Sequence, residues 1–240
     1  MNREDDFIPS IYSYCDRWCE RCEFTDRCRV YAMESERGLE DSDDPMGDAI
    51  RTVAQSLAEA KQMLMGHADE MGIDIESAKD DPEIAESIKR QRVAVENFEA
   101  VELAKQYALE GRHVLDASSD WLSNTDDPMA DEMLEILQWY LFFVAAKVHR
   151  GFHGIVDLDG DEDWEALQDI QSDANGTIKI ALIAIERSIL AWTYLMNSDN
   201  GEMIGPVIEK LETIKSLIER KFLNAREFVR PGFDEIEMIM

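Results

Sequence analysis

Hydrophobic positions recur with helical spacing along most of the chain. In the last apolar stretch Val207, Leu211, Ile214, Ile218 and Phe222 follow one another at intervals of three or four residues. This period places the five side chains on one face of an α-helix. We find no convincing run with the period of two that is typical of a half-buried strand. The pattern therefore predicts an all-α fold.

The starts of several expected helices are marked by proline. The tripeptide Asp-Asp-Pro occurs three times, with its prolines at Pro45, Pro82 and Pro128. Aspartate can accept a hydrogen bond from a free backbone N–H at a helix start, and proline fits the first helical position because its missing N–H costs nothing there. With the apolar periodicity, these signals predict about six helices, at about 9–37 through the cysteines, 45–65, 82–111, 128–150, 163–196 with an interruption near 175–176, and from 206 onward.

Two of these helices are apolar almost all round. They contain the stretches LEILQWYLFFVAAKV (134–148) and IKIALIAIERSILAWTYLM (178–196). Such helices occupy the centre of a bundle, and the amphipathic helices that begin at residues 45, 82 and 206 are expected to pack around them. We thus predict a metal-binding segment at 1–40, an acidic helical bundle at 41–230 and a loosely ordered tail at 231–240.

Charge restricts the partners. The chain has 52 acidic and 24 basic residues, a formal net charge of −28. Nucleic acid and anionic membranes need a basic surface, so neither is expected, whereas a basic protein partner is allowed. The start MNREDDF lacks the apolar region of a signal peptide, and the longest apolar run, 139–146, is too short to span a membrane. We predict a soluble, cytoplasmic protein, with its oligomeric state left open.

All four cysteines lie within fourteen positions, at Cys15, Cys19, Cys22 and Cys28. In the cytoplasm such a cluster is more often a metal site than a set of disulfides. In one straight helix Cys15 and Cys22 would stand about 10 Å apart along the axis, too far for a single tetrahedral zinc ion. Either the helix breaks near Cys19 to Cys22, or the bound group is larger. An iron–sulfur cluster of the [4Fe-4S] type is favoured over zinc; disulfides or free thiols are the third alternative.

The spacing also resembles two known iron–sulfur patterns. Cys19-x2-Cys22-x5-Cys28 is similar to the end of the [4Fe-4S] loop of helix-hairpin-helix DNA glycosylases, C-x6-C-x2-C-x5-C, with the first gap shortened to three. This resemblance covers about 15 residues and implies a cluster type, not a glycosylase activity. The first three cysteines fit the C-x3-C-x2-C spacing of radical S-adenosylmethionine enzymes, which use an α/β barrel and leave one iron open. Here a fourth cysteine would close the site.

A closed site implies a structural or electron-transfer role, because it has no open coordination position for a substrate. Trp18 and Tyr14 are expected to shield the site or to pack against the bundle. Four arginines lie in the same stretch, where they could donate to the sulfurs, pair with neighbouring acids or only solvate a helix. They are Arg17, Arg21, Arg27 and Arg29.

A helical-bundle enzyme with a buried carboxylate or di-metal site is the alternative. It would use Glu135, Glu186 and His149, but the ferritin-like template needs two E-x-x-H motifs, and the chain has one, at Glu110 and His113. An acidic protein-interaction module is a further alternative. The acidic loop 156–164 fits a calcium-binding loop poorly, so we expect Asp161 or Asp163 to cap a helix instead.

Overall fold

The computed structural model describes residues 6–36, 45–72, 81–118, 127–196 and 201–234. Within these ranges the chain is helical and has no β-strand, only an isolated bridge between Val156 and Glu162. The predicted all-α class is confirmed. Eight α-helices lie in the described ranges: α1 (Arg29–Glu36), α2 (Pro45–Met71), α4 (Pro82–Glu96), α5 (Glu99–Ala117), α7 (Pro128–His153), α8 (Trp164–Gln168), α9 (Asp173–Leu195) and α10 (Gly201–Lys221).

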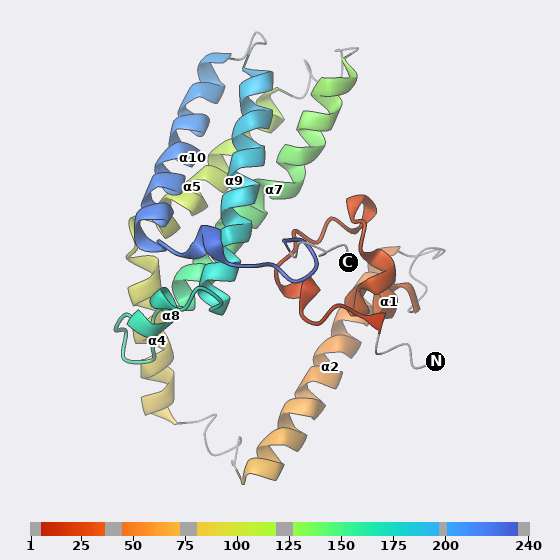
Figure 1. Ribbon diagram of the computed structural model, residues 1–240, viewed down its shortest axis with the longest axis vertical. Coiled ribbons are helices and arrows are strands. Elements are labelled where there is room, and N and C mark those ends of the chain that lie inside the picture. Colours follow the sequence, from red (N-terminus) through yellow and green to blue (C-terminus); the bar gives the residue numbers. More distant parts are fainter. Residues whose placement is uncertain (1–5, 37–44, 73–80, 119–126, 197–200, 235–240) are drawn as a thin grey trace, which may run out of the picture.

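Helices α7 and α9 form the centre of the bundle, as their apolar sequences predict. They pack along each other, α5 lies against α7, and α10 closes the group against α5 and α9 (Figure 1). Large side chains fill the core between them, including Leu137, Tyr140, Ile185 and Trp192, each at most 1% exposed. Burial of this apolar surface gives the bundle a core of its own.

The Asp-Asp-Pro signals mark helix starts. Asp81 accepts a hydrogen bond from the N–H of Glu83 at the start of α4, and Asp127 accepts one from Met129 at the start of α7. Pro45 is the first residue of α2, and the aspartates before it lie outside the described residues. Asp163 caps α8 through the N–H groups of the next turn, which confirms the expected role of this acidic loop.

One helix predicted to be continuous is divided, and another is divided at a different point from the one predicted. The helix expected at 82–111 ends at Glu96, and α5 restarts at Glu99. The interruption expected near 175–176 lies at 169–172, because Ser172 caps α9 by accepting from the N–H of Asn175. The buried amide of Asn175 then donates to the carbonyls of Leu167 and Asp169 and ties the end of α8 to α9. Asparagine and glycine at 175–176 therefore serve packing inside a helix, not a break.

Helix boundaries and the position of α2 also differ from the prediction. Helix α10 begins at Gly201 and includes Pro206, five residues after its start. Helix α2 extends to Met71 and does not pack around the centre: it stands apart from the bundle (Figure 1), and no other described element contacts it extensively. The amphipathic pattern identified the helix correctly, but a hydrophobic period does not say which surface the apolar face meets.

The first part of the tail is held in place. Gly232 has a left-handed φ of 78° and turns the chain against Ile8 and Ile11. Asp234 accepts hydrogen bonds from Arg230 and pairs with Lys179 at 2.7 Å. Partial burial alone would raise the pKa of Asp234, but these two cations hold it well below its usual range. Residues 231–234 thus make specific contacts; the loosely ordered tail at 231–240 stays a prediction, because 235–240 lie outside the described residues.

No helix in the described part of the chain is long and apolar enough to cross a membrane. This agrees with the short apolar run at 139–146 in the sequence.

Replacing Gly176 by alanine is expected to loosen both ends of the chain. A Cβ at this buried position of α9 would lie 2.6 Å from the rings of Tyr14 and Phe228, so both rings must move. We expect Gly176→Ala to lower the free energy of unfolding by about 1–3 kcal/mol. Thermal denaturation measures this loss, and faster hydrogen exchange in residues 6–28 should accompany it.

The matched control is Gly66→Ala in α2, where a Cβ meets no atom within 4 Å apart from its chain neighbours. This change should be neutral or stabilising by about 0.5–1 kcal/mol, because alanine restricts the unfolded chain more than glycine does. Equal stability losses in the two variants would show that the ring contacts at Gly176 are unimportant.

Candidate metal centre

The cysteine segment (residues 6–36) is built from short turns, not from one helix through the cysteines. Three 3₁₀ turns, Ile11–Ser13, Cys19–Arg21 and Thr25–Arg27, precede α1. The long first helix predicted from about residue 9 is therefore wrong. The chain breaks around Cys19 to Cys22, which is the first of the two alternatives that the axial separation of the cysteines left open. Arg17 has a left-handed φ of 61°, which reverses the chain direction between the first two turns.

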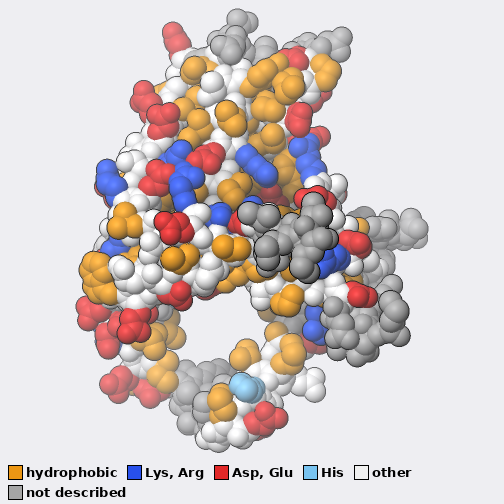
Figure 2. Space-filling model, viewed as in Figure 1, with side chains coloured by type: hydrophobic (Ala, Val, Ile, Leu, Met, Phe, Trp, Pro, Cys, Tyr) orange, Lys and Arg blue, Asp and Glu red, His pale blue; other side chains and the backbone are white. Residues whose placement is uncertain are grey.

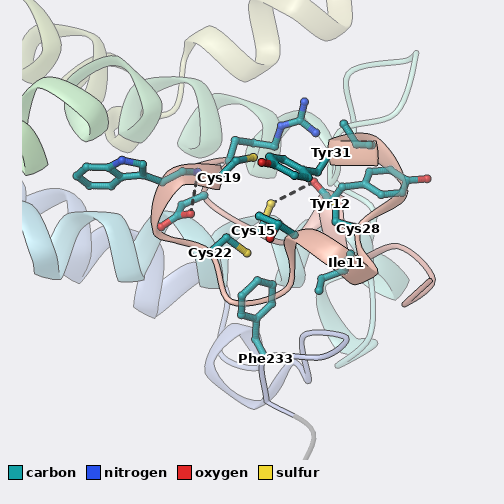
Figure 3. Close-up of a pocket in the computed structure, with 13 residues that line it drawn as sticks. Ile11, Tyr12, Cys15, Cys19, Cys22, Cys28, Tyr31 and Phe233 are labelled. Carbon is teal, nitrogen blue, oxygen red and sulfur yellow. Dashed lines mark hydrogen bonds between the residues drawn. The ribbon is translucent and has the colours of Figure 1, made fainter. Parts of the chain in front are cut away.

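These turns bring all four cysteines to one pocket (Figure 3). Cys15 follows the first turn, Cys19 begins the second, Cys22 ends it, and Cys28 ends the third. All four are half-buried and unpaired thiols. Apolar and aromatic side chains complete the wall: Ile11, Tyr12, Trp18, Val30, Tyr31 and Phe233.

The thiols stand in different local environments. The backbone N–H of Phe24 donates to the sulfur of Cys22 at 3.4 Å, and the Cys15 thiol donates to the carbonyl of Tyr12 at 3.6 Å. Burial raises the pKa of Cys15. Burial, followed by the negative charge of Glu34, raises the pKa of Cys19 to about 11, although the positive charge of Arg17 acts to lower it. Without a metal both groups are thiols at neutral pH, so metal binding there must release protons.

The donor set fits a thiolate-binding group, although the thiols are not arranged around a single point. In the described residues, no group of three or more His, Cys, Asp and Glu side chains is arranged to hold a metal ion. Four thiols around one largely apolar pocket, with a backbone N–H already directed at one sulfur, are the ligand type and surroundings of iron–sulfur clusters.

Asp16 attaches this segment to the centre of the bundle. Its carboxylate accepts a hydrogen bond from the hydroxyl of Tyr140 on α7 at 2.5 Å and pairs with Arg187 on α9 at 2.9 Å. Its backbone carbonyl accepts a further bond from the indole N–H of Trp139. Tyr140 is also hydrogen-bonded to Arg187, and burial, followed by the Asp16 contact, raises the tyrosine pKa. Three side chains of the two central helices therefore hold the residue next to Cys15.

Aromatic side chains extend this attachment. Trp18 stacks on Trp139 with ring centroids 5.2 Å apart and meets Tyr140 edge-on. The guanidinium carbon of Arg21 lies 4.1 Å from the centroid of the Trp18 ring. Tyr14 packs on Phe228 and donates to Asp173. The predicted packing of Trp18 and Tyr14 against the bundle is confirmed, and Trp18 also lines the cysteine pocket.

Two of the four arginines, Arg17 and Arg21, reach other elements. Arg17 pairs with Glu34 on α1, and Arg21 pairs with Glu135 at 2.6 Å and Glu132 at 3.5 Å, both on α7. These contacts differ from the expected pairing with acids within the cysteine stretch, because the turns point Arg21 at the bundle. The ion pairs are largely exposed and contribute orientation more than stability.

The residues considered for a carboxylate enzyme site are not brought together. Glu135 is exposed and paired with Arg21, whereas Glu186 pairs with Arg226 at 2.6 Å and Lys215 at 3.0 Å. Burial alone would raise the pKa of Glu186, but these two cations lower it. His149 stacks near His153, and burial followed by the charge of Lys105 lowers its pKa. Glu135 and Glu186 are each paired with basic side chains, as a carboxylate with a structural role would be. This pairing argues against catalysis at these two positions.

Several residues around the site could not be predicted from the sequence. Tyr140 and Arg187 lie in apolar stretches, and Phe233 lies in the predicted tail, yet it lines the pocket and meets Phe24 edge-on at 5.0 Å. Lys147 lies near Cys15, and burial lowers its pKa. For Arg187 the sequence does offer one signal. It is the only arginine in the apolar stretch 178–196, and a charge in such a stretch needs a partner.

Comparison with protein-family models, with curated proteins and with solved structures gives no match. The class that the structure defines is therefore an all-α bundle carrying a four-cysteine pocket on an attached N-terminal segment.

Removing the Asp16 carboxylate is expected to detach the cysteine segment. Asp16→Ala leaves the buried hydroxyl of Tyr140 without this acceptor and Arg187 without its ion pair, which should cost about 1–3 kcal/mol. Hydrogen exchange should rise in residues 10–28 and stay unchanged within α7 and α9. Exposed Asp26 provides the control, since Asp26→Ala removes the same charge from the same segment. Equal protection of residues 10–28 in both variants would contradict the role of Asp16.

Proposed function

We propose that this protein is a metal-binding protein whose four cysteines close around one iron–sulfur cluster in the cytoplasm, with a structural or electron-transfer role. The observation that carries the proposal is the convergence of Cys15, Cys19, Cys22 and Cys28 on one pocket from three separate turns. These are all the cysteines of the chain. Unpaired thiols in such a cluster suit a reducing compartment.

Two features favour a cluster over zinc. The spacing Cys19-x2-Cys22-x5-Cys28 resembles a known [4Fe-4S] loop, and a four-iron cluster, being larger than one ion, would tolerate cysteine ligands spread over several turns. Zinc would require the four sulfurs to approach one tetrahedral centre at about 2.3 Å each. Zinc remains the alternative that metal analysis distinguishes.

The chain's own residues would control such a group in two ways. Ile11, Trp18 and Phe233 line the pocket and would limit the exposure of a bound group, which is one of the factors that sets a cluster potential. The Phe24 N–H, directed at the Cys22 sulfur, would stabilise the thiolate. When bound, a cluster supplies one-electron chemistry or a cross-link, and four cysteine ligands leave no coordination position for a substrate.

Anaerobically purified protein should contain iron and acid-labile sulfide in the amounts of one cluster per chain. Zinc without iron would support the alternative metal. Absence of both metals, together with four freely alkylated thiols, would contradict the proposal.

The variant Cys22→Ser should lose the metal and loosen residues 10–36 while most helicity remains. The reason is that metal binding would add folding free energy to a segment of short turns that is held only by docking contacts, whereas the bundle has its own core. Metal analysis, circular dichroism and hydrogen exchange measure the three effects. Thr25→Ser alters another residue of the same pocket and should retain the metal. Melting of the whole protein in Cys22→Ser would show that the centre supports the bundle core.

A further inference from the structure

Helix α2 exposes a continuous apolar face to solvent. Large hydrophobic side chains along it remain accessible, with Ile50 62%, Leu57 66% and Leu64 66% exposed. Figure 2 shows orange side chains along the segment that stands away from the bundle, and open space separates this segment from the bundle. Val53, Met63 and Met71 are also exposed. Contiguous apolar surface of this kind is uncommon on monomers and marks an interaction site.

The spacing of these residues identifies the kind of partner. Ile50, Leu57, Leu64 and Met71 follow one another at intervals of seven, and Val53, Ala60 and His67 lie three residues after the first three. In heptad terms the first set occupies the a positions and the second the d positions. A repeat of seven corresponds to 3.5 residues per turn, so the seam stays on one line only when two helices wind around each other. The face therefore fits another long helix, not a sheet or a small molecule.

The flanking positions favour a second copy of the same helix. Residues at the e and g positions of a heptad choose the partner through their charges. Of the eight such positions between residues 47 and 70, two are charged, Lys61 and Glu70, in a chain with 52 acidic residues. In a parallel pair Ser56 would lie beside Lys61 of the other copy, so no like charges meet. The e and g positions therefore carry no like charges that would repel a second copy of the helix. They also lack the pattern of acidic residues that a basic partner would need.

We propose that α2 is a self-association surface that pairs with α2 of a second copy of this chain. The helix has 27 residues, about 40 Å of length, and its seam runs through three heptads. Such a contact is isologous, because the same residues serve both copies, and it closes at two chains. The proposal does not rest on the metal, since no residue of the seam lines the cysteine pocket.

Size-exclusion chromatography with light scattering on the full chain tests this. The wild type should have twice the chain mass of 27.5 kDa at micromolar concentration. Leu57→Glu with Leu64→Glu should be monomeric, with self-association weakened roughly 100-fold or more, because each substitution buries a carboxylate in an apolar seam. The control Gln55→Glu with Gln62→Glu adds the same two charges at exposed f positions and should remain a dimer.

Folding of the variants is checked independently. Glutamate is a good helix former and both leucines are exposed within one chain, so circular dichroism of the dilute variants should match the wild type. Hydrogen exchange within residues 45–71 should slow with rising wild-type concentration and be independent of concentration in the double variant. A monomeric wild type, or a dimer that survives both leucine substitutions, would overturn the proposal.

Discussion

The carboxylate of Asp16 joins the cysteine segment to the bundle, and the geometry of the site depends on that attachment. Tyr140 and Arg187 come from the two central helices, α7 and α9, and both meet this one side chain. A buried tyrosine hydroxyl requires a partner, and a carboxylate is the stronger acceptor. Because Asp16 is adjacent to Cys15 and two residues from Trp18, the contact fixes where the first cysteine and its aromatic cover lie relative to the core.

The same attachment explains how a segment with little regular secondary structure holds its shape. Around the cysteines the backbone forms 3₁₀ turns of three residues each, which are poor sources of stability by themselves. The segment is instead held by docking contacts: Trp18 on Trp139, Tyr14 on Phe228, and Phe24 on Phe233. Each contact joins the segment to the bundle or to the C-terminal residues. The pocket is thus assembled by parts of the chain that are far apart in sequence.

That long-range assembly determines what the sequence could predict. Local signals were sufficient for the aspartate caps at Asp81 and Asp127, for the two apolar central helices and for the clustering of the cysteines. They failed at 175–176, where tertiary packing keeps Asn175 and Gly176 helical, and in the cysteine segment, where i, i+4 and i+7 spacing suggested a helix that the docking contacts replace. Phe233 and Tyr140 could not be assigned to the site, because no local pattern records a contact between residues more than 100 positions apart.

The N-terminal third of the chain differs physically from the rest. From α5 onward the described helices bury their apolar residues against one another, so this part has a core that offsets the entropy of folding. The cysteine segment has half-buried thiols around one pocket, and α2 has an apolar face that no described element contacts extensively. Neither the thiols nor this face is covered by the bundle core. Under the two proposals made above, the order of these two regions depends partly on what they bind, whereas the order of the bundle does not.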